Sequence, residues 1–109
     1  MRRAQVFYRD VLAGQLVENE NGYSFTYDLS YLAAPGAEPI SLTMPLASKP
    51  YQSNVLFPFF DGLIPEGWLL DITVKNWKIN PNDRMGLLLA CCKDCIGAIG
   101  IIPINNEED

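Results

Sequence analysis

The first third of the chain alternates between apolar and polar residues, a pattern typical of β-strands with one buried face. β-Prone runs occupy residues 5–8 and 11–16, and Arg9-Asp10 between them predicts a two-residue turn. Gly14 interrupts the second run and is a candidate β-bulge. Together these features predict a β-hairpin near the start of the chain.

A second hairpin and a fourth strand are predicted downstream. Asn21-Gly22 is a strong signal for a tight hairpin turn. Residues 23–28 alternate after it, which places three aromatic side chains on one face. Residues 40–44 alternate in the same way, and Pro45 ends that run. The sequence therefore predicts four strands before the first long helix.

Three helices are predicted in the second half of the chain. The first covers about residues 53–62, with Pro58 in its first turn or at a kink. The second covers residues 69–77, where the apolar positions have an imperfect helical spacing. The third covers about residues 83–92 and is apolar nearly all round. We expect this third helix to be the most buried of the three.

The last predicted element is a strand over residues 96–104, and its apolar character on both faces predicts a central place in the sheet. The order of elements predicts an α+β fold, a small antiparallel β-sheet with about three helices packed to one side. We expect a single domain over residues 1–104, because a chain of 109 residues suits one hydrophobic core. Residues 105–109 are predicted to form a flexible acidic tail.

The most aromatic stretch of the chain covers residues 55–70. Three of the five phenylalanines lie within residues 57–60, and we expect them to belong to the core. A Pro-Glu-Gly turn at residues 65–67 follows, and Trp68 comes directly after it. The indole either packs into the core or lies at the rim of an element, where tryptophans serve as interface anchors. The sequence leaves both alternatives open.

Composition and charge narrow the classes of function. The net charge is −5, which argues against direct binding to nucleic acid, because that requires clustered Lys and Arg. No apolar run approaches the ~20 residues of a membrane span, and the first residues do not have the pattern of a signal peptide. The three cysteines cannot form a disulfide framework. We therefore expect a cytoplasmic protein.

The sequence has few residues arranged for catalysis or metal binding. The chain has no histidine, the commonest general base and zinc ligand. The cysteines within residues 91–95 resemble half of a thiolate metal site, but no second pair exists to complete it. A small thiol enzyme using Cys92 and Cys95 is one alternative, although the pair follows a predicted helix C-terminus, where the dipole does not lower a thiol pKa. We expect inert thiols, no metal, no cofactor and no enzymatic activity.

Four segments of the chain form a recognisable series. They are FTYDLSYL from residue 25, PISLTMPL from residue 39, FFDGLIPEG from residue 59 and DCIGAIGIIP from residue 94. In this order and spacing they resemble the N-terminal subdomain of HipA-type kinases, over nearly the whole chain. In those kinases the subdomain precedes a much larger catalytic region, whereas the sequence here ends shortly after Pro103.

A free-standing copy of this subdomain resembles HipS, the small component of HipBST toxin–antitoxin systems. The resemblance implies a non-catalytic antitoxin that binds and neutralises a HipT-like serine/threonine kinase toxin, in a complex that also contains a HipB-like DNA-binding protein. It also allows a regulatory or structural subunit that completes or stabilises the kinase without inhibiting it. We expect the antitoxin to insert Trp68 at or near the kinase cleft. The residues expected to bind the kinase are Asp61, Pro65, Glu66, Gly67, Trp68 and Leu69.

Overall fold

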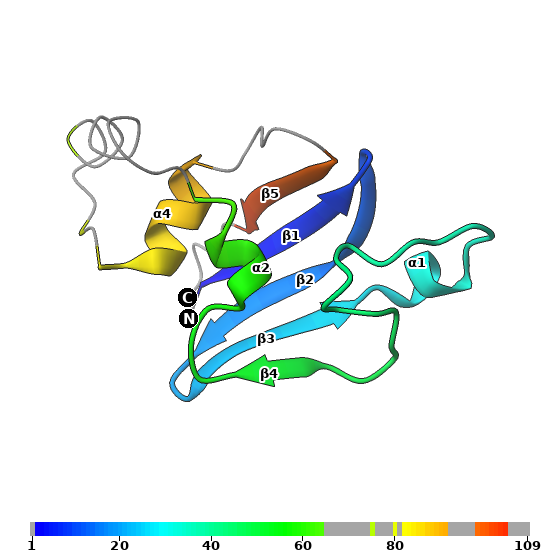
Figure 1. Ribbon diagram of the computed structural model, residues 1–109, viewed down its shortest axis with the longest axis horizontal. Coiled ribbons are helices and arrows are strands. Elements are labelled where there is room, and N and C mark those ends of the chain that lie inside the picture. The colour runs from blue at the N-terminus through cyan, green and yellow to red at the C-terminus, as the bar shows by residue number, and fades with distance from the viewer. Residues whose placement is uncertain (1, 65–74, 76–79, 81, 92–97, 105–109) are drawn as a thin grey trace.

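The computed structural model describes residues 2–64, 75, 80, 82–91 and 98–104. Five strands form one antiparallel sheet in the order β4-β3-β2-β1-β5 (Figure 1). Their bounds are β1 Arg3–Tyr8, β2 Val11–Asn19, β3 Gly22–Tyr27, β4 Tyr51–Ser53 and β5 Ile99–Ile104. The described helices are α1 Leu29–Ala33, α2 Pro58–Asp61 and α4 Arg84–Cys91. The predicted α+β class and single domain are confirmed.

The first hairpin forms as the sequence predicts. Arg9 and Asp10 have φ values of 51° and 66°, the left-handed conformation that a tight two-residue hairpin turn needs. The pairing register shifts between Val6, opposite Gly14, and Phe7, opposite Leu12. This irregularity lies at the predicted bulge, and a Cβ atom on Gly14 would be only 2.4 Å from the Thr26 carbonyl oxygen. Glycine is therefore required there by the close approach of β3.

The second hairpin also forms as predicted. Gly22, with φ 139°, pairs with Asn19 across a turn in which the Asn21 amide donates to Asn19 Oδ1 at 2.8 Å. The alternation along β3 puts Phe25 and Tyr27 in the core, with at most 1% of either residue exposed. The polar positions between them face the other side of the sheet, as one-sided burial of an antiparallel sheet requires.

The predicted strand over residues 40–44 is wrong. These residues form a turn in which the Met44 amide donates to the Ser41 carbonyl oxygen at 3.1 Å. The Tyr27 hydroxyl holds both ends of the turn, because it accepts from the Ile40 amide at 3.0 Å and donates to the Met44 carbonyl oxygen. Ile40 and Met44 are buried, but Leu42, which the alternation would place on the same face, is 95% exposed, so the burial does not follow the period of a strand. The second strand that pairs with β3, besides β2, is β4, in a stretch where the sequence predicts no strand.

Two of the predicted helices, α2 and α4, form where the sequence predicts them but are shorter than predicted. α2 begins at Pro58 rather than at residue 53 or 54, because proline fits the first helical position, where no amide hydrogen is needed. α4 follows Asp83, whose carboxylate accepts from the Gly86 amide at 3.1 Å and caps the helix. α1 is a short helix in a stretch for which the sequence predicts no helix or strand. The predicted helix at 69–77 lies outside the described residues apart from Lys75, as does the tail at 105–109.

The predicted central position of the last strand is also wrong. β5 pairs with β1 alone among the described strands and lies at the edge of the sheet. The Arg9 amide donates to the Ala98 carbonyl oxygen at 2.7 Å, and the alternation of an antiparallel ladder from that pair turns the nitrogen of Pro103 away from β1. Proline, which cannot donate to a ladder, suits such an edge. The predicted residues 96 and 97 lie outside the described part of the chain.

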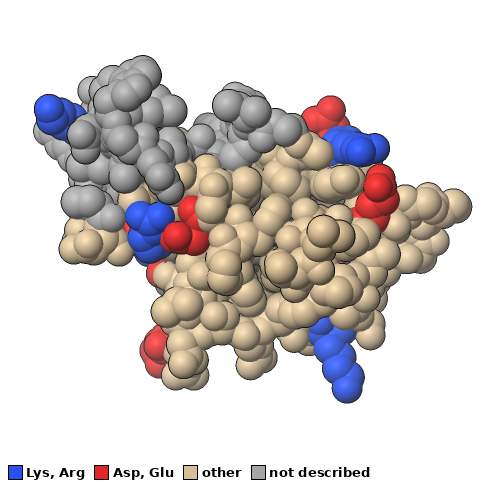
Figure 2. Space-filling model, viewed as in Figure 1, with Lys and Arg blue, Asp and Glu red and all other residues tan. Residues whose placement is uncertain are grey.

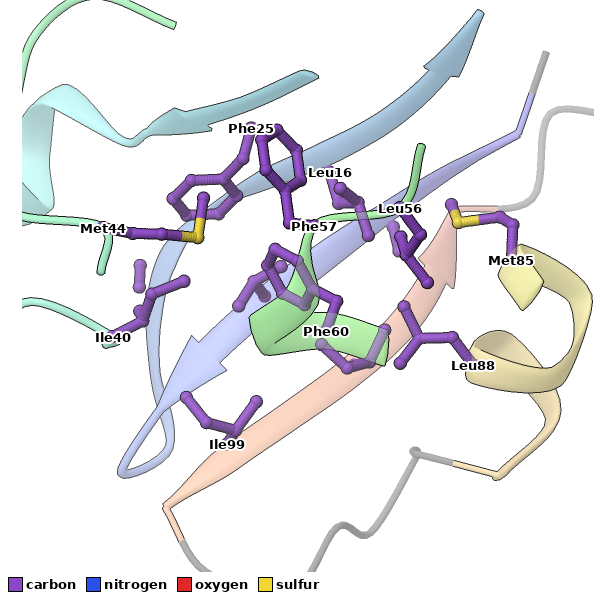
Figure 3. Close-up of a cluster of buried hydrophobic side chains, with 14 of the residues drawn as sticks. Leu16, Phe25, Ile40, Met44, Leu56, Phe57, Phe60, Met85, Leu88 and Ile99 are labelled. Atoms are coloured by element: carbon purple, nitrogen blue, oxygen red, sulfur yellow. The ribbon is translucent and has the colours of Figure 1, made fainter. Parts of the chain in front are cut away.

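The core lies between the sheet and the helices α2 and α4. Figure 3 shows Phe60 of α2 near the centre of this cluster, with Leu16 and Phe25 from the sheet and Leu88 from α4 around it. Phe60 of α2 and Met85, Leu87 and Leu88 of α4 have no exposed surface. Whether the last helix is the most buried of the three stays a prediction, because the predicted helix at 69–77 lies outside the described residues apart from Lys75. The placement of phenylalanines in the core is confirmed for Phe57 and Phe60, while Phe59 is only partly buried.

Candidate partner-binding site

The helix α2 determines where the predicted kinase-binding segment begins. Its backbone turns tightly at its end, where the Leu63 amide donates to the Phe60 carbonyl oxygen at 3.0 Å and the Ile64 amide to that of Asp61 at 3.2 Å. The side chains of Phe60 and Ile64 are buried, with 0% and 4% exposed. These two anchors fix the backbone from which residue 65 starts.

Asp61 is the one predicted kinase-binding residue that the structure describes. Its Oδ1 atom accepts a hydrogen bond from Arg84 Nε at 2.6 Å, which joins the end of α2 to the start of α4. About two-fifths of each side chain is exposed, 42% for Asp61 and 38% for Arg84. An ion pair of this exposure stabilises a fold by less than about 1 kcal/mol. It is therefore a contact between α2 and α4 and not a large source of stability. The other five predicted residues lie outside the described part of the chain.

A second ionic cluster holds α4 against the sheet. The Arg2 guanidinium donates from Nε to Glu18 Oε1 at 2.6 Å and from Nη2 to Asp83 Oδ1 at 2.8 Å. It also donates from Nη1 to Asp83 Oδ2 at 2.9 Å, so its planar fork engages both carboxylates. These hydrogen bonds lower the pKa of Asp83 and raise that of Arg2. Since Asp83 also caps α4, Arg2 fixes that helix to β1 and β2.

Sequence reasoning missed an apolar hollow beside α2. We call it the α2 hollow; it has a volume of about 140 Å³. Its lining residues are Thr43, Met44, Tyr51, Phe57, Pro58 and Phe59. The hollow depends on the turn at residues 40–44, which the sequence presented as a strand. The sequence gives no local sign of the hollow itself, but Pro39 and Pro45, which bracket residues 40–44, could have indicated a turn rather than a strand, because proline cannot donate to a ladder.

The alternative chemistry receives no support from the described residues. Cys92 and Cys95 of the thiol alternative lie outside them. Within the described residues, no group of three cysteine or acidic side chains is arranged to hold a metal ion. None of the described helices is long and apolar enough to cross a membrane.

Comparison with known proteins identifies the family of this small α+β domain. The family model of the HipA N-terminal domain matches residues 4–102. The chain belongs to the HipA N-terminal domain family. The resemblance inferred from the sequence motifs is confirmed at the level of the family.

A solved structure and two relatives sharpen the comparison. The N-terminal domain of the HipA toxin superposes with a TM-score of 0.74 at 28% identity, covering 98% of this chain and 96% of that domain. An uncharacterized protein of Haemophilus influenzae strain Rd is 33% identical over 101 residues, 93% of this chain and 92% of that protein. A putative kinase of Sinorhizobium fredii, Y4mE, is 26% identical over 108 residues, and the match spans only 26% of its length.

Proposed function

We propose that this protein is the non-catalytic antitoxin of a tripartite toxin–antitoxin system. In this proposal it binds a HipT-like serine/threonine kinase toxin and neutralises it, in a complex that also holds a HipB-like DNA-binding protein. The observation that carries the proposal is that the same domain matches part of a long putative kinase and almost all of a short protein. It matches a quarter of the putative kinase of S. fredii and nearly the whole of the relative from H. influenzae. A domain with both occurrences is suited to act on a kinase from a separate chain.

Trp68 is the proposed anchor of the complex. A partner bound without a covalent link must offset the lost translational and rotational freedom of association by burying side chains. A tryptophan supplies a large apolar area together with one N–H donor, and it is enriched among the residues that dominate interface energies. We place Trp68 at or near the kinase cleft, with Pro65, Glu66, Gly67 and Leu69 as its neighbours in the contact.

The described residues support this role by the contacts that hold α2 and α4 in place next to Ile64. α2 is anchored in the core by Phe60 and joined to α4 by Asp61 and Arg84. α4 is held in turn by Arg2 through Asp83.

Co-expression of the protein with its HipT-like kinase tests the proposal. Growth and co-purification are scored together, and the kinase expressed alone is the control. We expect growth to be rescued and the two proteins to purify as a stable complex. A complex without rescue would favour the other role, a subunit that completes or stabilises the kinase without inhibiting it. Absence of any complex would refute both roles.

A further inference from the structure

The Arg2 guanidinium binds two carboxylates that come from distant parts of the chain. Its Nε and Nη2 atoms donate to Glu18 Oε1 at 2.6 Å and Oε2 at 2.9 Å. Its Nη2 and Nη1 atoms donate to Asp83 Oδ1 at 2.8 Å and Oδ2 at 2.9 Å. Both carboxylates are thus held in the bidentate geometry that makes such contacts strong. We call these three residues the Arg2 clamp, which joins the residue before β1, the strand β2 and the start of α4.

The first turn of α4 has room for the Arg2 clamp because residue 86 is a glycine. A Cβ atom on Gly86 would lie 2.4 Å from Asp83 Oδ2 and 3.2 Å from Arg2 Nη1. Alanine ordinarily favours a helix more than glycine does. Glycine at this position therefore lowers the helix propensity of α4 but lets the carboxylate and the guanidinium approach its backbone.

The Arg2 clamp also keeps two like charges apart. The side chains of Arg2, Glu18 and Asp83 are 39%, 25% and 34% exposed, so water screens them less than it screens fully exposed groups. An isolated surface ion pair contributes little to stability, whereas a network of charges with bidentate geometry is the exception. Without the guanidinium, the two carboxylates would lie close together and repel. Loss of Arg2 would therefore turn an attraction between α4 and the sheet into a repulsion.

Other described contacts of α4 involve its apolar face and the helix α2. Leu87 and Leu88 are buried, and Arg84 pairs with Asp61. Figure 2 shows positive and negative side chains in contact where α2 approaches α4, whereas the middle of this face has no charged group. None of these contacts belongs to the ladders that hold the five strands together. α4 can therefore leave the sheet without breaking a strand pairing, and such elements open as local units.

We propose that the Arg2 clamp is an ionic latch for α4. With the clamp in place the helix is docked on the sheet, and without it α4 opens while the strands stay paired. Because Arg84 directly follows Asp83, opening also separates Arg84 from Asp61. The latch thus links the start of the chain to the contact between α2 and α4. This inference goes beyond the proposed function and does not depend on it, since no kinase takes part in the opening.

Amide hydrogen exchange of the free protein tests the latch. Arg2→Lys keeps the positive charge but cannot bind both carboxylates in bidentate geometry. Gly86→Ala displaces the Asp83 carboxylate by its added Cβ atom. In both variants we expect the amides of α4, such as that of Leu87, to exchange about tenfold faster or more, because hydrogen bonds between charged groups are lost. The amides of β2 and β3 should exchange at the wild-type rate.

The matched control is Arg9→Lys, the same chemical change at an arginine outside the clamp. Arg9 lies 3.5 Å from Glu38 in an ion pair whose side chains are 68% and 53% exposed. We expect wild-type exchange of α4 in this variant. Wild-type or slower exchange of α4 in both clamp variants would overturn the latch. Equal acceleration in α4, β2 and β3 would also overturn it, because that result is global unfolding and not local opening.

Discussion

The Trp68→Ala protein is expected to remain folded, to bind the kinase roughly 30-fold more weakly or worse, and to lose neutralisation of the toxin. Truncation of an interface hot spot costs about 2 kcal/mol or more, which is this factor in affinity. The expected result separates the two alternatives that the sequence leaves open for the indole. An anchor at the interface affects binding, whereas a core tryptophan affects the free energy of unfolding by about 3–5 kcal/mol.

The measurements for Trp68→Ala are therefore affinity by calorimetry, unfolding by urea and growth in the presence of the toxin. Trp77→Ala is the control, because it makes the same chemical change in the other tryptophan of the chain. Unchanged affinity and unchanged neutralisation would refute insertion of Trp68. A loss of stability with normal affinity after correction for the folded fraction would assign Trp68 to the core.

The Phe60→Ala protein is expected to be destabilised by about 3–5 kcal/mol, the cost of removing a buried phenyl ring and leaving a cavity. Phe60 has no exposed surface, and its ring centroid lies 5.7 Å from that of Phe25 and 5.2 Å from that of Phe59. Folded domains are stable by only ~5–15 kcal/mol, so this single change removes much of the total. α2 would lose its anchor in the core.

Urea denaturation of the wild-type and Phe60→Ala proteins measures this loss of folding stability. Phe59→Ala is the matched control, since the neighbouring ring is only partly buried and its removal should cost distinctly less. A destabilisation of Phe60→Ala below about 1 kcal/mol, or equal to that of the control, would contradict the position of Phe60 at the centre of the core.

Local turn chemistry explains why the two hairpins could be predicted. Arg9-Asp10 and the turn between Asn19 and Gly22 fix the direction reversals, and the alternation of β3 fixes which side is buried. Each of these signals acts over a few residues, so it can be read from the sequence. The same holds for α4, whose start is marked by the cap at Asp83.

The errors arise where distant residues decide the local structure. Residues 40–44 alternate as a strand does, yet the hydroxyl of Tyr27 holds both ends of a turn, 13 and 17 residues away along the chain. β5 is apolar enough for a central strand, but its pairing with β1 leaves it at the edge of the described sheet. In residues 40–44 the alternation did not even predict burial, because Leu42 is 95% exposed. In β5 the apolar residues did not show how many neighbouring strands the segment has.

The candidate site shows the same division between local and distant information. The sequence indicates Asp61 as a site residue but contains no local sign of its partner, Arg84, which is 23 residues away. The contact between Arg2 and Asp83 spans 81 residues. The α2 hollow combines residues from three separate segments of the chain and could not be read from any of them.

The central claim, inhibition of a kinase by direct contact, is tested most directly by titrating purified HipT-like kinase with this protein and measuring its phosphorylation activity. If the protein inhibits by binding one to one, the phosphorylation activity of the kinase should fall linearly and reach its minimum near one equivalent of this protein. The fraction of kinase in the complex should rise over the same range. Activity that stays constant or rises while the complex forms would contradict the claim.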